Sequence, residues 1–305
     1  MGHLTNIEFG EDGIEFDDIG TSRISEAYDL WPDLVEQAVL LDSEIRMLQG
    51  NVMGVDFEGS GVHSDIFDKK SAYLLYDWIA GHVRERALVL GLKSEYTVAR
   101  VLLRTNLEAR MTGVFMNSLA NEEFREEFRQ QLNSMDNNTL QRTFGASNPW
   151  EVLDEISRAN FESTAGIFDI INETNNQDFH DIHNGLIRDT LYDFQYFDPK
   201  SKHDIKQCYS GLSSSVHAHI EESLVRRSIT ENSNPFESPT HSEESLQTFL
   251  SQFQAVLDIE GVLILNEYEA VIEQNREVRD LLETTEYHLP GLEDTKRKLT
   301  EVLSE

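Results

Sequence analysis

The helical spacing of apolar residues is the feature of this sequence that most constrains its fold. In the segment 24–48, apolar residues recur at steps of three and four: Ile24, Leu30, Leu34, Ala38, Leu41, Ile45 and Leu48. An α-helix places such residues on one face, which then packs against a core. Comparable stripes predict further helices over 65–90, 94–119, 121–132, 148–174, 178–197, 198–228, 240–282 and 292–303. Gly91 is expected to end the helix predicted over 65–90.

Such stripes cover most of the 305 residues, so the sequence predicts an all-α fold. Long amphipathic helices joined by short polar loops favour antiparallel neighbours. We find no repeat with a period of about 20 to 50 residues, which argues against a solenoid. We therefore expect a multi-helix bundle of about seven to nine helices, with a small N-terminal β-hairpin and a long C-terminal helix.

Changes in composition divide the chain into four parts. We expect an acidic N-terminal arm or hairpin, a helical bundle, a linker and a C-terminal helical segment at 1–22, 23–229, 230–240 and 241–305. Alternating residues around Gly10 and Gly13 favour a loose hairpin over a disordered arm. The residues from Thr240 to Glu243 match a capping box, which predicts that the last long helix begins there. This C-terminal segment is expected to pack back on the bundle or to reach a partner chain.

The balance of acidic and basic residues indicates in which environment the protein works and which classes of partner it can bind. The net charge is -31, and the basic residues comprise eight lysines against seventeen arginines. Acid excess with few lysines is typical of proteins from extreme halophiles, because at about 1 M salt the Debye length falls to about 3 Å and self-repulsion is screened. The alternatives are an acidic buffer protein, a DNA mimic or a calcium binder. Such a surface makes DNA and anionic membranes poor partners.

Cysteine use and the N-terminal sequence predict a soluble, cytoplasmic protein. Cys208 is the only cysteine, so no internal disulfide can form, as expected in a reducing interior. Residues 1–18 lack the basic and apolar regions of a signal peptide, and no stretch has 18 or more continuous apolar residues. P-loop, G-x-G-x-x-G, G-x-S-x-G and CxxC patterns are absent. We therefore predict no cofactor and no membrane partner.

The helix predicted over 94–119 carries charged residues in its apolar stripe, which reads Val101, Arg104, Glu108, Met111 and Phe115. A buried arginine and carboxylate need hydrogen-bond partners from another helix, because desolvation costs several kcal/mol per ion. Tyr209, Ser213 and His217 are spaced by four and can supply them from one helical face.

These five residues are the candidate catalytic set. Arg104 would hold an anionic group, Glu108 would orient it, and His217 would exchange a proton. The alternative is a satisfied polar network, with Tyr209 and Ser213 among its members, that only fixes the helix register.

The same residues carry a resemblance. An R-x-x-L-E helix at Arg104 to Glu108, followed by Y-x-x-L-S-x-x-V-H at Tyr209 to His217, resembles an uncharacterised family of all-helical prokaryotic proteins. That family is similar in outline to the HEPN superfamily of helical nucleases and nucleotide-binding modules. The resemblance covers residues 71–220 and implies a bundle with a polar pocket and metal-independent RNA cleavage in defence or stress. HEPN ribonucleases carry a histidine four to six residues after an arginine, and this sequence has no such pair.

A metal site has one weak candidate. His180 and His183, three residues apart, would share a helix face and could bind a divalent ion with a carboxylate from elsewhere. The alternative is solvated surface, and we find no Glu-x-x-His partner motif. We therefore predict no metal.

Two functional hypotheses follow. The first is a noncatalytic helical interaction or assembly module of a halophile cytoplasm, which self-associates or binds a protein partner through its C-terminal helices. The alternative is a HEPN-like RNA-cleaving or nucleotide-binding protein, and only this alternative makes RNA a partner.

Overall fold

The computed structural model describes residues 7–10, 13–16, 22–53, 71–118, 122–135, 184–193, 197, 199–216 and 242–304. Within them it confirms an all-α, multi-helix bundle. The helices are α1 (Ser22–Leu30), α2 (Pro32–Val52), α4 (Ser71–Leu92), α5 (Tyr96–Ser118), α6 (Glu122–Asn133), α11 (Asn184–Asp193), α12 (Pro199–Val216), α14 (Glu243–Gln274), α15 (Arg276–Thr284) and α16 (Glu293–Ser304). Ahead of them, β1 (Ile7–Gly10) and β2 (Gly13–Phe16) form an antiparallel hairpin in which Ile7 pairs with Phe16.

The first predicted helix is two helices. It breaks between α1 and α2, where Pro32 occupies the first turn of α2, a position at which proline is well tolerated. Ile24, Leu41 and Leu48 are buried as predicted. Leu30 is 53% exposed, so its expected place in the core stripe was wrong. The break at Pro32 interrupts the single helical periodicity on which that expectation depended.

Helices α4 and α5 form an antiparallel pair, and the turn between them contains Ser94 at a φ of 65°. The prediction that Gly91 ends the first of these helices was wrong, because α4 continues to Leu92. Gly91 instead permits close packing. A Cβ atom at this position would lie 2.1 Å from the ring of Phe249 on α14.

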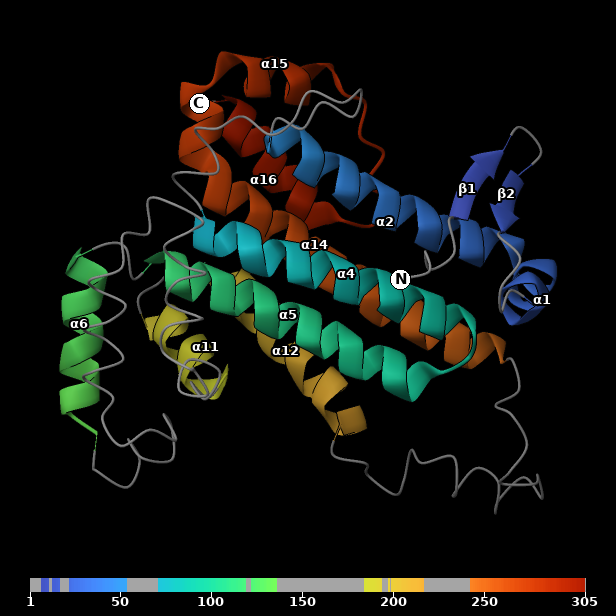
Figure 1. Ribbon diagram of the computed structural model, residues 1–305, viewed down its shortest axis with the longest axis horizontal. Coiled ribbons are helices and arrows are strands. Elements are labelled where there is room, and N and C mark those ends of the chain that lie inside the picture. The colour runs from blue at the N-terminus through green and yellow to red at the C-terminus, as the bar shows by residue number, and fades with distance from the viewer. Residues whose placement is uncertain are drawn as a thin grey trace.

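Helix α14 is the centre of the bundle. It packs against α2, α4, α5, α12 and α16, and Figure 1 shows it running behind α4 between α2 and α5. Its buried side includes Phe249, Phe253, Leu257 and Ile264. The C-terminal segment therefore packs back on the bundle and supplies much of its core.

The cap of α14 differs from the predicted one. Ser242 is the N-cap residue, and its hydroxyl accepts a hydrogen bond from the backbone N–H of Ser245. The predicted capping box began two residues earlier, at Thr240. At the other end, Asn275 closes α14, and its side chain accepts hydrogen bonds from the backbone of Glu277 and Val278 to begin α15. The predicted single helix over 240–282 is thus divided at Asn275.

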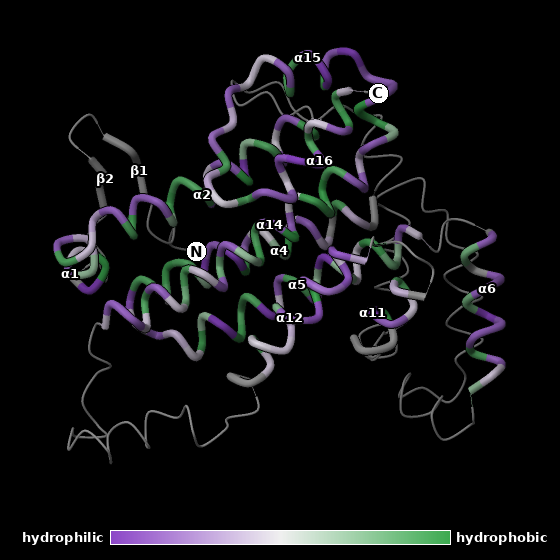
Figure 2. The backbone as a smooth tube through the Cα atoms, turned by 180° about the vertical axis from the view of Figure 1, so that it is seen from behind, coloured by the Kyte–Doolittle hydropathy of each residue, from purple (hydrophilic) through white to green (hydrophobic). Residues whose placement is uncertain are grey.

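Among the described residues, α14 is the one helix long and apolar enough to cross a membrane by length and composition. Most of its apolar window is buried inside the bundle, as in a core helix of a soluble protein. Figure 2 shows hydrophilic and hydrophobic residues alternating along the helices. This pattern is expected where each helix has one face in the core and one in water.

The remaining helices surround this centre. Helices α15 and α16 pack on α14, and α15 also contacts α2. Helix α6 reaches the end of α5 through contacts of Phe124 and Phe128 with Phe115. Helices α11 and α12 pack against α5, and Figure 1 shows all three close together. The interface between α5, α11 and α12 holds the candidate site.

Candidate functional site

Helices α5 and α12 bring three of the five predicted site residues together. The Arg104 Nε atom donates to Glu108 Oε1 at 2.8 Å, and Arg104 Nη2 donates to the Tyr209 hydroxyl at 2.7 Å. The Tyr209 hydroxyl in turn donates to Glu108 Oε1 at 2.7 Å. Arginine, carboxylate and phenol therefore form a closed hydrogen-bonded triangle, which we call the Arg104 cluster.

The other two predicted residues are not part of this triangle. Ser213 donates its hydroxyl to the backbone carbonyl of Tyr209, one turn earlier on α12, at 2.7 Å. His217 lies outside the described residues, as do His180 and His183. The described helix α12 ends at Val216.

The Arg104 cluster is half-buried at the edge of the core. The side chains of Arg104 and Glu108 are each 19% exposed, so the prediction of a core position for them was wrong. The face of α5 that packs into the core holds Leu103, Leu107 and Arg110 instead. Met111 and Phe115 are buried, as predicted. The cluster therefore remains within reach of a ligand.

The protonation states at the Arg104 cluster are set by burial and by its internal bonds. Burial raises the pKa of Tyr209, the hydrogen bond with Glu108 adds to this, and the nearby Arg104 acts in the opposite direction. Burial lowers the pKa of Arg104, but bonds to Glu108 and Tyr209 outweigh it and raise the pKa overall. At neutral pH the phenol is therefore a neutral donor and the guanidinium is charged.

One group of the Arg104 cluster lacks a partner. Among the described residues, Arg104 Nη1 is buried and makes no hydrogen bond. A buried donor without an acceptor costs about 1 to 3 kcal/mol, and more when it is charged. The guanidinium of Arg188 on α11 lies 5.0 Å from the centroid of the Tyr209 ring, and that of Arg104 lies 4.8 Å from it. Two guanidinium groups therefore contact one tyrosine ring.

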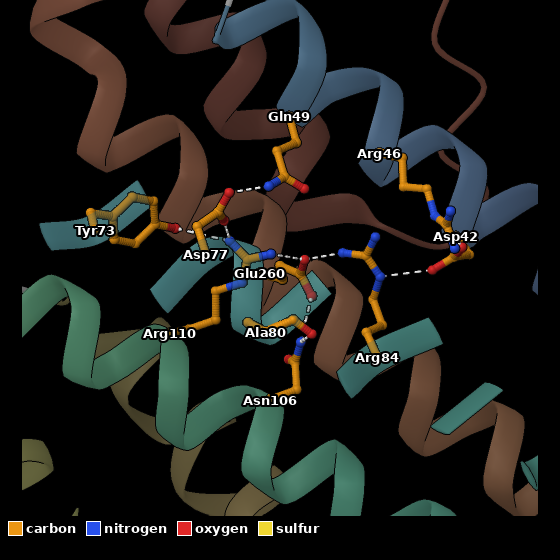
Figure 3. Close-up of polar contacts among 10 residues, drawn as sticks. All are labelled: Asp42, Arg46, Gln49, Tyr73, Asp77, Ala80, Arg84, Asn106, Arg110 and Glu260. Carbon is orange, nitrogen blue, oxygen red and sulfur yellow. Dashed lines mark hydrogen bonds and ion pairs between the residues drawn. The ribbon is translucent and has the colours of Figure 1, made fainter. Parts of the chain in front are cut away.

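A second polar cluster lies in the core, and the sequence analysis did not identify it. Figure 3 shows Glu260 of α14 between two arginines, Arg84 of α4 and Arg110 of α5. Oε1 of Glu260 accepts from Arg84 Nη1 and Arg110 Nη2, and Oε2 accepts from Asn106 Nδ2 at 3.4 Å. All four side chains are buried. We call this group and its acidic partners the Glu260 network.

Two aspartates complete the Glu260 network. Arg84 Nε donates to Asp42 Oδ1 at 2.7 Å, and Arg110 Nη1 is paired with Asp77. Asp42 also binds Arg46, whose side chain is 46% exposed, at 2.7 Å. The three carboxylates are therefore balanced by three guanidinium groups, and the chain of contacts runs from the surface into the core (Figure 3).

The charges of the Glu260 network hold one another in place. Burial lowers the pKa of Arg84, but Glu260 and Asp42 together raise it above its ordinary value. Burial likewise lowers the pKa of Arg110, whereas Glu260 and then Tyr73 raise it. Both arginines stay charged. Arg110 Nε and Asn106 Oδ1 make no hydrogen bond among the described residues, but both side chains are fully buried, so a ligand in solution does not reach them.

The sequence did contain a signal for this network. Glu260 is a single carboxylate between Ile259, Gly261, Val262 and Leu263 in an apolar helix. A lone ionised residue in such a position needs a buried partner. The pattern therefore indicates that an ion pair exists, but it does not identify the arginines that complete it.

A groove of about 420 Å³ lies between α12 and α14, and its lining includes Phe197, Ile205, Cys208, Ile259 and Leu263. Lys200 stands at this groove, bound to Asp204 at 2.9 Å and to Asp294. Among the described residues, no group of three or more histidine, cysteine or acidic side chains is arranged to hold a metal ion.

Cys208 is expected to react slowly in the folded protein. Burial raises the pKa of its thiol to about 12, whereas an unperturbed cysteine has a pKa of about 8.5. Near pH 8 the folded chain therefore contains little thiolate, the reactive form. We predict that an aromatic disulfide reagent labels Cys208 at least about 100-fold more slowly in the folded chain than in urea. Equal rates, followed by absorbance, would contradict the burial of this thiol.

The chain matches no protein-family model, no curated protein and no solved structure. The geometry of the two clusters is therefore what indicates a function.

Proposed function

We propose that this protein is a noncatalytic helical binding module of a halophile cytoplasm, and that it recognises an anionic group of its ligand at the Arg104 cluster. The observation that carries the proposal is Arg104 Nη1, which is buried and has no acceptor among the described residues. An anionic oxygen placed against this atom would satisfy it. Guanidinium groups bind phosphate and carboxylate well because their planar donors match two oxygens at once.

The described chemistry favours binding over reaction. Glu108 Oε1 accepts hydrogen bonds from both Arg104 and Tyr209, so this oxygen is already occupied within the cluster. Tyr209 keeps its proton because its pKa is raised. The Ser213 hydroxyl donates to a backbone carbonyl. These groups are arranged to orient a charge, and the described part of the cluster provides no activated nucleophile.

The charge of the chain supports the proposed environment. With a net charge of -31, the protein would repel an anionic ligand in dilute buffer. At about 1 M salt this long-range repulsion is screened within about 3 Å, whereas a direct hydrogen bond to Arg104 persists. Binding through directed donors in molar salt is therefore compatible with an acidic surface.

Because α14 packs in the core of the bundle, we place the proposed interaction elsewhere than on the C-terminal helices. Its apolar stripe is buried against the rest of the bundle, so self-association is not needed to explain that stripe. The Arg104 cluster, on α5 and α12, is partly exposed, and its Arg104 Nη1 atom makes no hydrogen bond among the described residues. This is the surface at which we place the ligand.

The test is the free energy of unfolding in molar KCl, measured with potassium phosphate and with extra KCl at the same ionic strength. A ligand that binds only the folded chain adds about 2.7 kcal/mol at a concentration one hundred times its Kd. Phosphate should stabilise the wild-type chain, and Arg104→Gln should lose most of this increment. Arg276→Gln is the matched control, because Arg276 is on α15 with a side chain 90% exposed.

The control separates site binding from the general stabilisation of folded proteins by phosphate, which acts on all variants alike. An equal phosphate increment in wild type, Arg104→Gln and Arg276→Gln would overturn the proposal.

A further inference from the structure

Helix α12 extends the Arg104 cluster with two lysines. Lys202, Lys206 and Tyr209 are separated by four and three residues, so they lie on one face of the helix. At a rise of about 1.5 Å per residue, this row is about 10 Å long. On α11, Arg188 and Tyr192 are also four residues apart and share a face.

Ring contacts show that these two faces meet. The Nζ atoms of Lys202 and Lys206 lie 5.0 Å and 4.9 Å from the centroid of the Tyr192 ring. Arg188, one turn before Tyr192, contacts the Tyr209 ring beside Arg104. The four cations Arg104, Arg188, Lys202 and Lys206 therefore form one continuous group, which we call the cationic row.

The lysines of the cationic row are not neutralised by the carboxylates that the structure describes, although Lys202 Nζ donates to the backbone carbonyl of Tyr192 at 3.5 Å. Among the described residues, no carboxylate lies within ion-pair distance of Lys202 or Lys206. By contrast, Lys200, Lys296 and Lys298 each bind a carboxylate.

The carboxylates bound to the cationic row are too few to balance it. Those described are Glu108, bound to Arg104, and Asp189, which is 3.4 Å from Arg188. Within the part of the chain that the structure describes, the row therefore carries a local excess of positive charge, on a chain of net charge -31.

We propose that the cationic row binds a small ligand with two or more linked phosphates, such as an inorganic polyphosphate or the phosphate chain of a nucleotide. This inference rests on the proposed function, with one phosphate at Arg104 and the next ones toward Lys206 and Lys202. A single phosphate is too short to contact a row of about 10 Å. Guanidinium and ammonium groups are the usual partners of phosphate oxygens.

The rings of the site favour a small phosphate compound over RNA. Single-stranded nucleic acids bind where aromatic faces are open to stacking by bases. Here cations already lie over the rings of Tyr192 and Tyr209, and Tyr192 is buried. A long polyanion would also meet the acidic surface beyond the row.

The experiment is calorimetric titration in molar KCl with inorganic orthophosphate and inorganic triphosphate as separate probes. For the wild-type chain we expect triphosphate to bind at least about tenfold more tightly than orthophosphate. Lys206→Gln should weaken triphosphate binding by about threefold or more and weaken orthophosphate binding less, so that the ratio of the two affinities falls. Lys296→Gln, outside the cationic row and on helix α16, should change neither affinity, because Lys296 is paired with Glu293.

The other possible results distinguish a failure of this inference from a failure of the proposed function. Equal affinities for the two probes, or a Lys206→Gln variant with the wild-type ratio, would overturn the inference and leave the proposed function standing. Binding of a single-stranded oligoribonucleotide more tightly than triphosphate would also overturn it. If neither phosphate binds the wild-type chain, the proposed function fails as well.

Discussion

Replacing Glu260 by glutamine is expected to destabilise the folded chain by about 3 to 5 kcal/mol, because it leaves buried arginine charge without its carboxylate. Glu260 Oε1 accepts from both Arg84 and Arg110, and all three side chains are buried. Glutamine keeps the shape of glutamate, but it removes the charge and turns one acceptor into a donor that faces other donors. The loss is measured by urea unfolding in molar KCl.

Glu273→Gln is the matched control for this prediction. Glu273 lies on the same helix, α14, and is exposed. Its substitution should change the free energy of unfolding by no more than about 0.5 kcal/mol. A Glu260→Gln chain as stable as Glu273→Gln would show that the network does not hold the core together.

Replacing Gly91 by alanine is expected to cost about 1 to 3 kcal/mol, because the added methyl group would overpack the contact between α4 and α14. Three ring atoms of Phe249 lie between 2.1 and 2.6 Å from the position of the new Cβ atom. Phe249 is fully buried and also contacts Tyr96 and Phe253, so its ring cannot move without displacing neighbours.

For Gly81, on the same helix, we expect replacement by alanine to have the opposite effect on stability. No atom lies within 4 Å of a Cβ atom built at Gly81. Gly81→Ala should therefore stabilise the chain by about 0.5 to 1 kcal/mol, the usual gain of alanine over glycine inside a helix. Thermal unfolding of the two variants side by side measures both effects. The same direction of change in both would contradict the packing of α4 on α14.

The sequence predicted the elements that depend on local periodicity. Stripes at three- and four-residue steps identify α2, α5 and α14, and a four-residue step aligns Tyr209 with Ser213 on α12. An arginine and a glutamate four residues apart on a helix can bind each other, as Arg104 and Glu108 do. That their partner is Tyr209, 105 residues after Arg104, came from matching two polar faces.

Features that depend on contacts between distant segments were not predicted. The predicted stripe of α5 was correct at Met111 and Phe115 but was offset by one residue at Arg104 and Glu108, so Arg104 was expected in the core and Arg110 was not considered. The ion pair between Arg84 and Glu260 joins residues 176 positions apart, and helical spacing carries no information on such pairing. From the local sequence alone, Gly91 likewise resembles a residue that ends a helix. Its role in close packing is seen only with Phe249 of α14 beside it.

The protein contains two polar clusters, and we propose that they have different roles. The Glu260 network is buried and its charges are balanced, and its role is to stabilise the fold. The Arg104 cluster is partly exposed and has one unbonded donor, and we propose that it binds an anion. Each cluster should therefore respond to a different measurement.

The most direct test is the free energy of unfolding of Arg104→Gln and Glu260→Gln in molar KCl, each with and without phosphate. We expect Glu260→Gln to lose about 3 to 5 kcal/mol of stability but to keep the wild-type phosphate increment. Arg104→Gln should lose no more than about 2 kcal/mol and most of the increment. If both variants lower stability and increment together, or if Arg104→Gln keeps the full increment, the division of tasks between the two clusters is wrong.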